Sequence, residues 1–232
     1  LNYSKQKHSS HIQSKLKMNI GGISKLSKER LLNELKKILK PVTLERLSED
    51  KFSLDLILLI FPELKNIKDI FKLNGDKKKI LTEIDFIFLL CLMIIDETDN
   101  AEYFLYKYNI SKKDQKRIKI IHDFYKENHY LKSFNENKLN KIFYYNGKQS
   151  VIDIINFKIF KLKKIDKNLI NLCQKYRLKV LPIMPIGAEI LMTKYNISEG
   201  KQLGTKLKLI EEEWVNNNFK ISDQQVNYII KN

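Results

Sequence analysis

The chain has 232 residues, of which 43% are apolar and 30% charged, and it carries a formal net charge of +16. This apolar content is enough for a hydrophobic core and excludes wholesale disorder, and the length allows one large or two small domains. With only 7 glycines and 4 prolines, a fold of many strands joined by tight turns is disfavoured, so the composition favours a mostly helical protein.

The positive charge predicts a polyanionic partner such as RNA. A second interpretation stays open, because nearly all the basic residues are lysines and Asn and Ile are also abundant. That combination is typical of an AT-rich genome, which raises the lysine content of a protein whatever its function. The sequence alone therefore allows both explanations of the charge, an RNA-binding surface and a compositional bias.

The first strongly periodic segment predicts a helix over 27–39. Ser27 is placed to cap its N-terminus and Glu29 to face the helix dipole in the first turn, while apolar residues recur at helical spacing as far as Leu39. A weaker helix over 8–19 precedes it, interrupted at Gly21-Gly22, and Pro41 is expected to end the periodic helix. Further apolar stripes predict helices over 44–47, 54–61, 80–95, 102–108, 114–127, 138–145, 150–160 and 167–177.

Short connections between successive helices predict an all-α fold, a helical bundle or array with a small helical tail. Cys91 lies in the apolar run 86–95 and is expected to be a small buried hydrophobe. Cys91 and Cys173 form no Cys-x-x-Cys pair, so we expect no zinc and a reduced cytoplasmic setting. The run 86–95 is about half of a membrane span, so no membrane partner is expected.

The tail begins with Leu-Pro-Ile-Met-Pro-Ile-Gly over 181–187, which opens a short helix. Gly200 and Gly204 then open a longer helix. Gly187, Gly200 and Gly204 permit positive φ and close approach of a partner to the backbone. The N–H groups at the start of the longer helix suit a phosphate, and Lys201 and Lys206 would add charge, so these five residues are the candidate RNA contacts.

Trp214, the only tryptophan, lies at helical spacing from apolar neighbours and is expected to be a core anchor rather than a base-stacking residue. The acidic cluster over 96–99 is expected to be a solvated helix end. All four histidines, His8, His11, His122 and His129, are expected at the surface. The sequence contains no Asp-x-Asp pair for two-metal nucleotidyl transfer, so we assign it no catalytic residue and no metal ligand.

A second motif lies on the helix over 27–39, where Ser27 is followed by Glu29-Arg30 and then by Glu34. Arg30 and Glu34 have the i, i+4 spacing of residues on one helix face. Taken alone, the motif could be an ordinary surface salt bridge, which contributes less than about 1 kcal/mol. An apolar helix ending in Pro-Glu follows over 56–64, and the tail motif Pro-x-x-Pro-x-Gly comes last.

These three motifs, in this order, resemble the neck, body and tail of class II tRNA nucleotidyltransferases, the CCA-adding enzymes, and of the related poly(A) polymerases. The resemblance spans essentially the whole chain. It implies the end of the neck and an RNA-binding helical domain over 1–75, a helical body over 76–180 and a tail over 181–232. Two departures lie in the tail, where Ala188 and Glu189 replace the usual charged residue and Asp, and a glycine expected near Tyr195 is missing.

The resemblance implies a parent enzyme that uses CTP, ATP and Mg²⁺ to add CCA to tRNA 3′ ends, with its nucleotide and metal sites outside this chain. The metal-binding Asp pair and the Glu-Asp-x-x-Arg nucleotide-selecting motif are both missing from the sequence, which begins at Leu1. We therefore expect part of a longer protein that binds RNA and is inactive alone. Two alternatives stay open: the C-terminal part of a poly(A) polymerase, and a non-enzymatic helical RNA-binding module.

Overall fold

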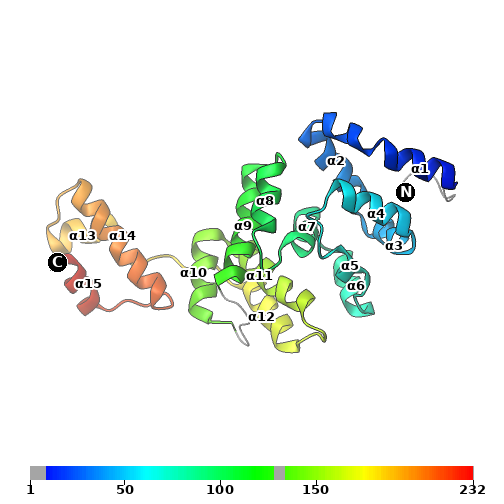
Figure 1. Cartoon of the computed structure of the whole chain (residues 1–232). Helices are drawn as coiled ribbons and strands as arrows, with labels where there is room; N and C mark the ends of the chain where they lie inside the picture. The colour runs from blue at the N-terminus through cyan, green and yellow to red at the C-terminus, as the bar shows by residue number, and fades with distance from the viewer. Residues whose placement is uncertain (1–8, 128–133, 232) are drawn as a thin grey trace. The chain divides into compact units, whose positions relative to one another are not determined.

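The computed structural model describes residues 9–127 and 134–231 and confirms an all-α protein, without a strand in those residues (Figure 1). One 3₁₀ helix, η1, interrupts the first helices at Gly21-Gly22, where the sequence predicts a break. The helices are α1 Ser10–Met18, η1 Ile20–Lys25, α2 Lys28–Ile38, α3 Pro41–Glu49, α4 Lys51–Ile60, α5 Ile67–Phe71, α6 Gly75–Leu81, α7 Phe86–Ile94, α8 Asn100–Lys107, α9 Lys112–Glu127, α10 Glu136–Asn146, α11 Lys148–Lys161, α12 Lys167–Leu178, α13 Ala188–Tyr195, α14 Lys201–Asn216 and α15 Asp223–Lys231.

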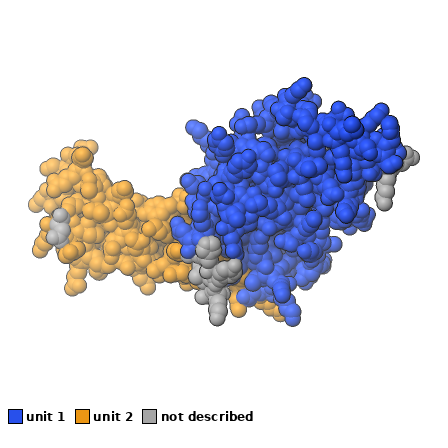
Figure 2. All heavy atoms as spheres, viewed as in Figure 1, with its two compact units in different colours: residues 1–129, 156–166 blue, residues 130–155, 167–232 orange. Residues whose placement is uncertain are grey.

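The chain forms two compact units, which Figure 2 shows in different colours. Unit 1 comprises residues 1–129 and 156–166, and unit 2 comprises residues 130–155 and 167–232. The expected boundary between 75 and 76 lies inside unit 1, at the start of α6. The three-part division drawn from the family resemblance stays a prediction.

Helix α7 forms the centre of the unit 1 core. Every residue from Phe88 to Ile94 is buried, including Cys91, which confirms the expected small buried hydrophobe. The single helix expected over 80–95 is wrong, because α6 ends at Leu81 and α7 begins at Phe86. Asp85 causes this division: its carboxylate accepts a hydrogen bond from the Phe88 N–H at 3.0 Å and caps a new helix.

A buried lysine joins two distant segments of unit 1. Lys77 on α6 donates from Nζ to the carbonyl oxygens of Phe160, at 3.1 Å, and of Leu162, both at the end of α11. The last carbonyls of a helix have no intrahelical donor, so Lys77 satisfies two of them. Burial lowers the pKa of the Lys77 ammonium below its ordinary value.

In unit 2, a buried amide holds α10, α12 and the loop after α14 together. The Asn140 side chain accepts a hydrogen bond from the Tyr176 hydroxyl at 2.9 Å and donates one to Asn218 at 2.8 Å. Trp214 packs between the rings of Tyr144 on α10 and Phe219, and it is 2% exposed. This confirms that Trp214 is a core anchor. The tail helices α13, α14 and α15 share a small core of Leu191, Leu203, Ile210 and Val226.

Candidate nucleic-acid interface

Helix α2 displays the first motif at the surface. The Ser27 hydroxyl accepts a hydrogen bond from the Arg30 N–H at 3.2 Å, and Glu29 lies in the first turn, which confirms the predicted cap. Leu35 on the opposite side of the helix is buried. The apolar stripe therefore attaches α2 to unit 1, and the side chains of Ser27, Glu29, Arg30 and Glu34 are all exposed to solvent.

The ordinary salt bridge between Arg30 and Glu34, one of the two interpretations of the motif, is not found in the described residues. Glu34 accepts its hydrogen bond from Lys37, with the lysine Nζ 2.8 Å from Oε1. Both side chains of this pair are more than half exposed, so it contributes little to stability. Arg30 is consequently directed to solvent, where its guanidinium is accessible to an acceptor on another molecule.

The tail glycines differ in what their backbone requires. Gly200, the residue before α14, has φ of +146°, a conformation that side chains with a Cβ rarely adopt. Gly187, the residue before α13, has φ of −101°, and Gly204 is an ordinary residue of α14. The need for glycine is therefore shown at Gly200 and does not apply to Gly187 or Gly204.

The start of α14 has the features of an anion-attracting helix N-terminus. Its first N–H groups have no intrahelical acceptor, Gly200 provides no side-chain cap, and the first turn holds no acidic residue. Lys201 and Gly204 are exposed beside this end. The helix dipole and the Lys201 ammonium both favour a negatively charged group there.

The prediction that Lys206 contacts phosphate is not supported, because its side chain is buried. Its side chain packs among the tail helices, the residue is 9% exposed, and Nζ donates a hydrogen bond to the carbonyl oxygen of Ile229 at 2.8 Å. Ile229 is near the end of α15, so Lys206 satisfies a terminal carbonyl of that helix. Of the two lysines predicted to contact phosphate, only Lys201 is at the surface.

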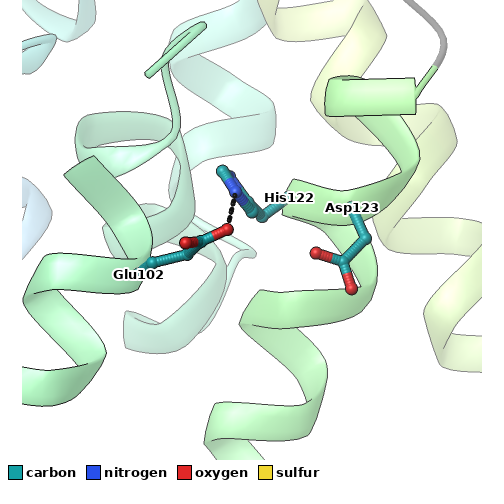
Figure 3. A group of neighbouring side chains, drawn as sticks. All are labelled: Glu102, His122 and Asp123. Carbon is teal, nitrogen blue, oxygen red and sulfur yellow. Dashed lines mark hydrogen bonds and ion pairs between the residues drawn. The ribbon is translucent and has the colours of Figure 1, made fainter. Parts of the chain in front are cut away.

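A second cluster of polar side chains lies between α8 and α9 in unit 1 (Figure 3). His122 is 2% exposed, so the expectation of a surface histidine is wrong there; His11 is exposed as expected, and His8 and His129 lie outside the described residues. His122 Nε2 is 3.2 Å from Glu102 Oε1. Hydrogen bonds from Lys126 and then from His122 lower the pKa of the Glu102 carboxyl.

Glu102, His122 and Asp123 offer ligand atoms within 4.8 Å of one another. Two observations make the group a poor metal site. The Lys126 ammonium already lies 2.9 Å from Glu102 Oε1, and buried Nδ1 of His122 has no hydrogen-bond partner among the described residues. A ligating histidine almost always donates its second N–H to an acceptor. The cluster is therefore best described as an ion pair that joins α8 to α9.

The uncapped start of α14, with exposed Lys201 beside it, can hold a phosphate. The carboxylates of Glu34 and Glu102 are each paired with a lysine. No protein-family model matches this sequence, and no curated protein matches it. None of the described helices is long and apolar enough to cross a membrane.

Proposed function

We propose that this chain is the RNA-binding helical part of a class II tRNA nucleotidyltransferase, the enzyme that adds CCA to tRNA 3′ ends. In this proposal the parent enzyme binds CTP, ATP and Mg²⁺ outside this chain. The tRNA 3′-hydroxyl is the nucleophile, and the helical part positions the tRNA through phosphate contacts and shape.

The observation that carries the proposal is the order of the three family motifs along an all-α chain. The first motif lies on the exposed side of α2, with Ser27 as its cap. The Pro-Glu motif follows α4, where Glu63 is buried and accepts a hydrogen bond from Lys107 at 2.7 Å. The tail motif precedes α13. Gly200 then precedes α14, and its positive φ is a conformation that favours glycine.

Charge supports the same proposal. The chain carries +16, and Lys201 beside the start of α14 is exposed to solvent. Binding that depends on phosphate contacts releases counterions from RNA, so its affinity falls as the salt concentration rises. A specific interface must further distinguish a folded tRNA from any other polyanion of equal charge.

The first experiment measures binding by fluorescence anisotropy, using a tRNA that lacks CCA and a DNA duplex with the same number of phosphates. The proposal predicts tighter binding to the tRNA than to the duplex from about 50 to 200 mM salt. Replacing Lys201 by Ala should weaken tRNA binding and reduce the salt slope by about 1. The matched control Lys113→Ala, on the exposed side of α9, should leave both unchanged.

Equal affinity for tRNA and the duplex, or equal effects of Lys201→Ala and Lys113→Ala, would support the genomic-bias interpretation and overturn the proposal. The chain alone is also expected to incorporate no nucleotide when tRNA, CTP, ATP and Mg²⁺ are supplied. Incorporation by the pure chain would contradict the assignment of catalysis to another part of the protein.

The poly(A) polymerase alternative shares the same helical architecture and differs in the RNA that it extends. It predicts that an oligo(A) strand competes for the chain as well as the tRNA does. A non-enzymatic RNA-binding module predicts a tRNA preference without any parent enzyme. That alternative is tested by isolating the native protein from its source and assaying it for CTP incorporation into tRNA that lacks CCA.

A further inference from the structure

Helix α8 presents two tyrosine rings to solvent. Tyr103 is 54% exposed and Tyr106 is 85% exposed. Residues three apart on a helix are neighbours on one face, so both rings lie on the same side of α8. The third aromatic side chain of this helix, Phe104, is fully buried and anchors α8 in the unit 1 core. The attachment of α8 through Phe104 therefore leaves both tyrosine rings exposed to solvent.

Each exposed ring has a lysine ammonium beside it. Lys107 Nζ lies 5.9 Å from the Tyr103 ring centroid, and Lys28 Nζ lies 6.0 Å from the Tyr106 centroid. Both distances are within the range of a cation–π contact. Lys28 is the first residue of α2, directly after Ser27, so the surface motif of α2 and the exposed rings of α8 are adjacent in unit 1.

The charges around these rings suit a polyanion. The only acidic residue of α8 is Glu102, and its carboxylate is already paired with Lys126 at 2.9 Å. Lys107 is held in place by its ion pair with buried Glu63, at 2.7 Å, which offsets its charge, so Lys28 is the cation beside these rings that can meet a phosphate. Proteins that bind single-stranded nucleic acid combine exposed aromatic rings, on which bases stack, with cations that follow the phosphates.

We propose that Tyr103 and Tyr106 form a stacking platform for unpaired RNA bases, with Lys28 beside a flanking phosphate. This inference rests on the proposed function only in taking RNA as the ligand. It assigns to α8 a contact with single-stranded RNA, in addition to the phosphate contacts expected at the start of α14. Stacking tolerates any base, because every base has a π face, so the platform is not expected to select a sequence.

The test uses a fluorescein-labelled oligo(U) strand, which has no paired bases, and a fully paired RNA hairpin with the same number of phosphates. The double variant Tyr103→Ala with Tyr106→Ala should lose about tenfold or more in affinity for oligo(U). It should change little in affinity for the hairpin, whose bases are stacked within the helix. Far-UV circular dichroism should be unchanged, because both rings are exposed.

Three control variants separate stacking from other effects. The double variant Tyr103→Phe with Tyr106→Phe retains both rings and should bind oligo(U) as the wild type does. Tyr228→Ala removes an exposed tyrosine of α15 and should have no effect. Lys28→Ala should reduce the salt slope for oligo(U) by about 1.

The outcomes distinguish the two proposals. Wild-type chain that binds neither tRNA nor oligo(U) would refute the proposed function and, with it, the platform. Tight binding of tRNA combined with unchanged oligo(U) affinity in the alanine double variant would refute the platform alone. Equal losses for oligo(U) and the hairpin would also overturn it, because a stacking contact requires unpaired bases.

Discussion

Replacing Trp214 by Ala tests how the tail helix α14 is attached to α10. The indole is 2% exposed, and its ring centroid lies 5.4 Å from that of Tyr144 and 5.1 Å from that of Phe219, with edge-on and tilted orientations. Such geometry is favoured by the ring quadrupoles. The substitution removes the largest side chain between α10 and α14 and leaves a cavity that the rigid helices fill only in part.

Loss of a buried tryptophan costs about 3–5 kcal/mol of unfolding free energy, a range that already includes the cavity. With a urea dependence of about 2 kcal/mol per M, the unfolding midpoint should fall by about 1.5–2.5 M. The chain has two compact units, so the shift is expected in the transition that involves unit 2.

The assay is urea unfolding followed by far-UV circular dichroism, with Leu209→Ala as the matched control. Leu209 lies on the same helix but is exposed, so its loss should cost about 0.5 kcal/mol or less. The conservative change Trp214→Phe should lower stability and leave tRNA affinity unchanged, because a buried ring cannot stack on a base. Equal midpoints for Trp214→Ala and Leu209→Ala, or tRNA affinity lost in Trp214→Phe, would refute the reasoning.

Three further predictions concern the tail and α10. Gly200→Ala should lower the thermal midpoint, because φ of +146° costs about 1–3 kcal/mol for a residue with a side chain. Its control, Gly204→Ala, should raise stability by about 0.5–1 kcal/mol, because Gly204 lies within α14 and has open space for a Cβ. Lys206→Met should cost about 1–3 kcal/mol in urea unfolding by leaving the Ile229 carbonyl without its donor, and full stability in this variant would contradict the cap. Burial, followed by the bond to a carboxylate, raises the pKa of Tyr144 to about 12, so stability should fall as pH rises from about 10 through 12; Tyr144→Phe should lessen that fall.

The sign of this last effect follows from the direction of the shift. A group whose pKa is raised in the folded state binds its proton more tightly there, so its contribution is complete below the unfolded pKa and is lost above it. The Tyr144 hydroxyl donates to Glu211 at 2.6 Å, which requires the protonated phenol. Spectrophotometric titration at alkaline pH should show one fewer late-titrating tyrosine in the phenylalanine variant.

The sequence by itself determined the helical class and the Ser27 cap. These features depend on a few consecutive residues: apolar spacing defines a helix face, and a hydroxyl or carboxylate defines a cap. The same local chemistry identifies Asp85 as a cap. A capping residue inside the helix expected over 80–95 therefore indicated two helices, although the apolar spacing runs through it. The backbone conformation then distinguished Gly200, with its positive φ, from Gly187 and Gly204.

Only the tertiary structure decided where the long polar side chains lie. Lys77 meets carbonyls 83 and 85 residues later in the chain, Lys206 meets Ile229, and His122 is buried against Glu102. The neighbouring residues in the sequence do not show whether a lysine ammonium reaches water or the carbonyls at a helix end, because the flexible side chain allows either. The exposure of Tyr106 was equally hidden, since an aromatic residue at helical spacing is ordinarily part of a core. Contacts between distant segments, rather than local spacing, therefore determine which cations and rings remain exposed to solvent.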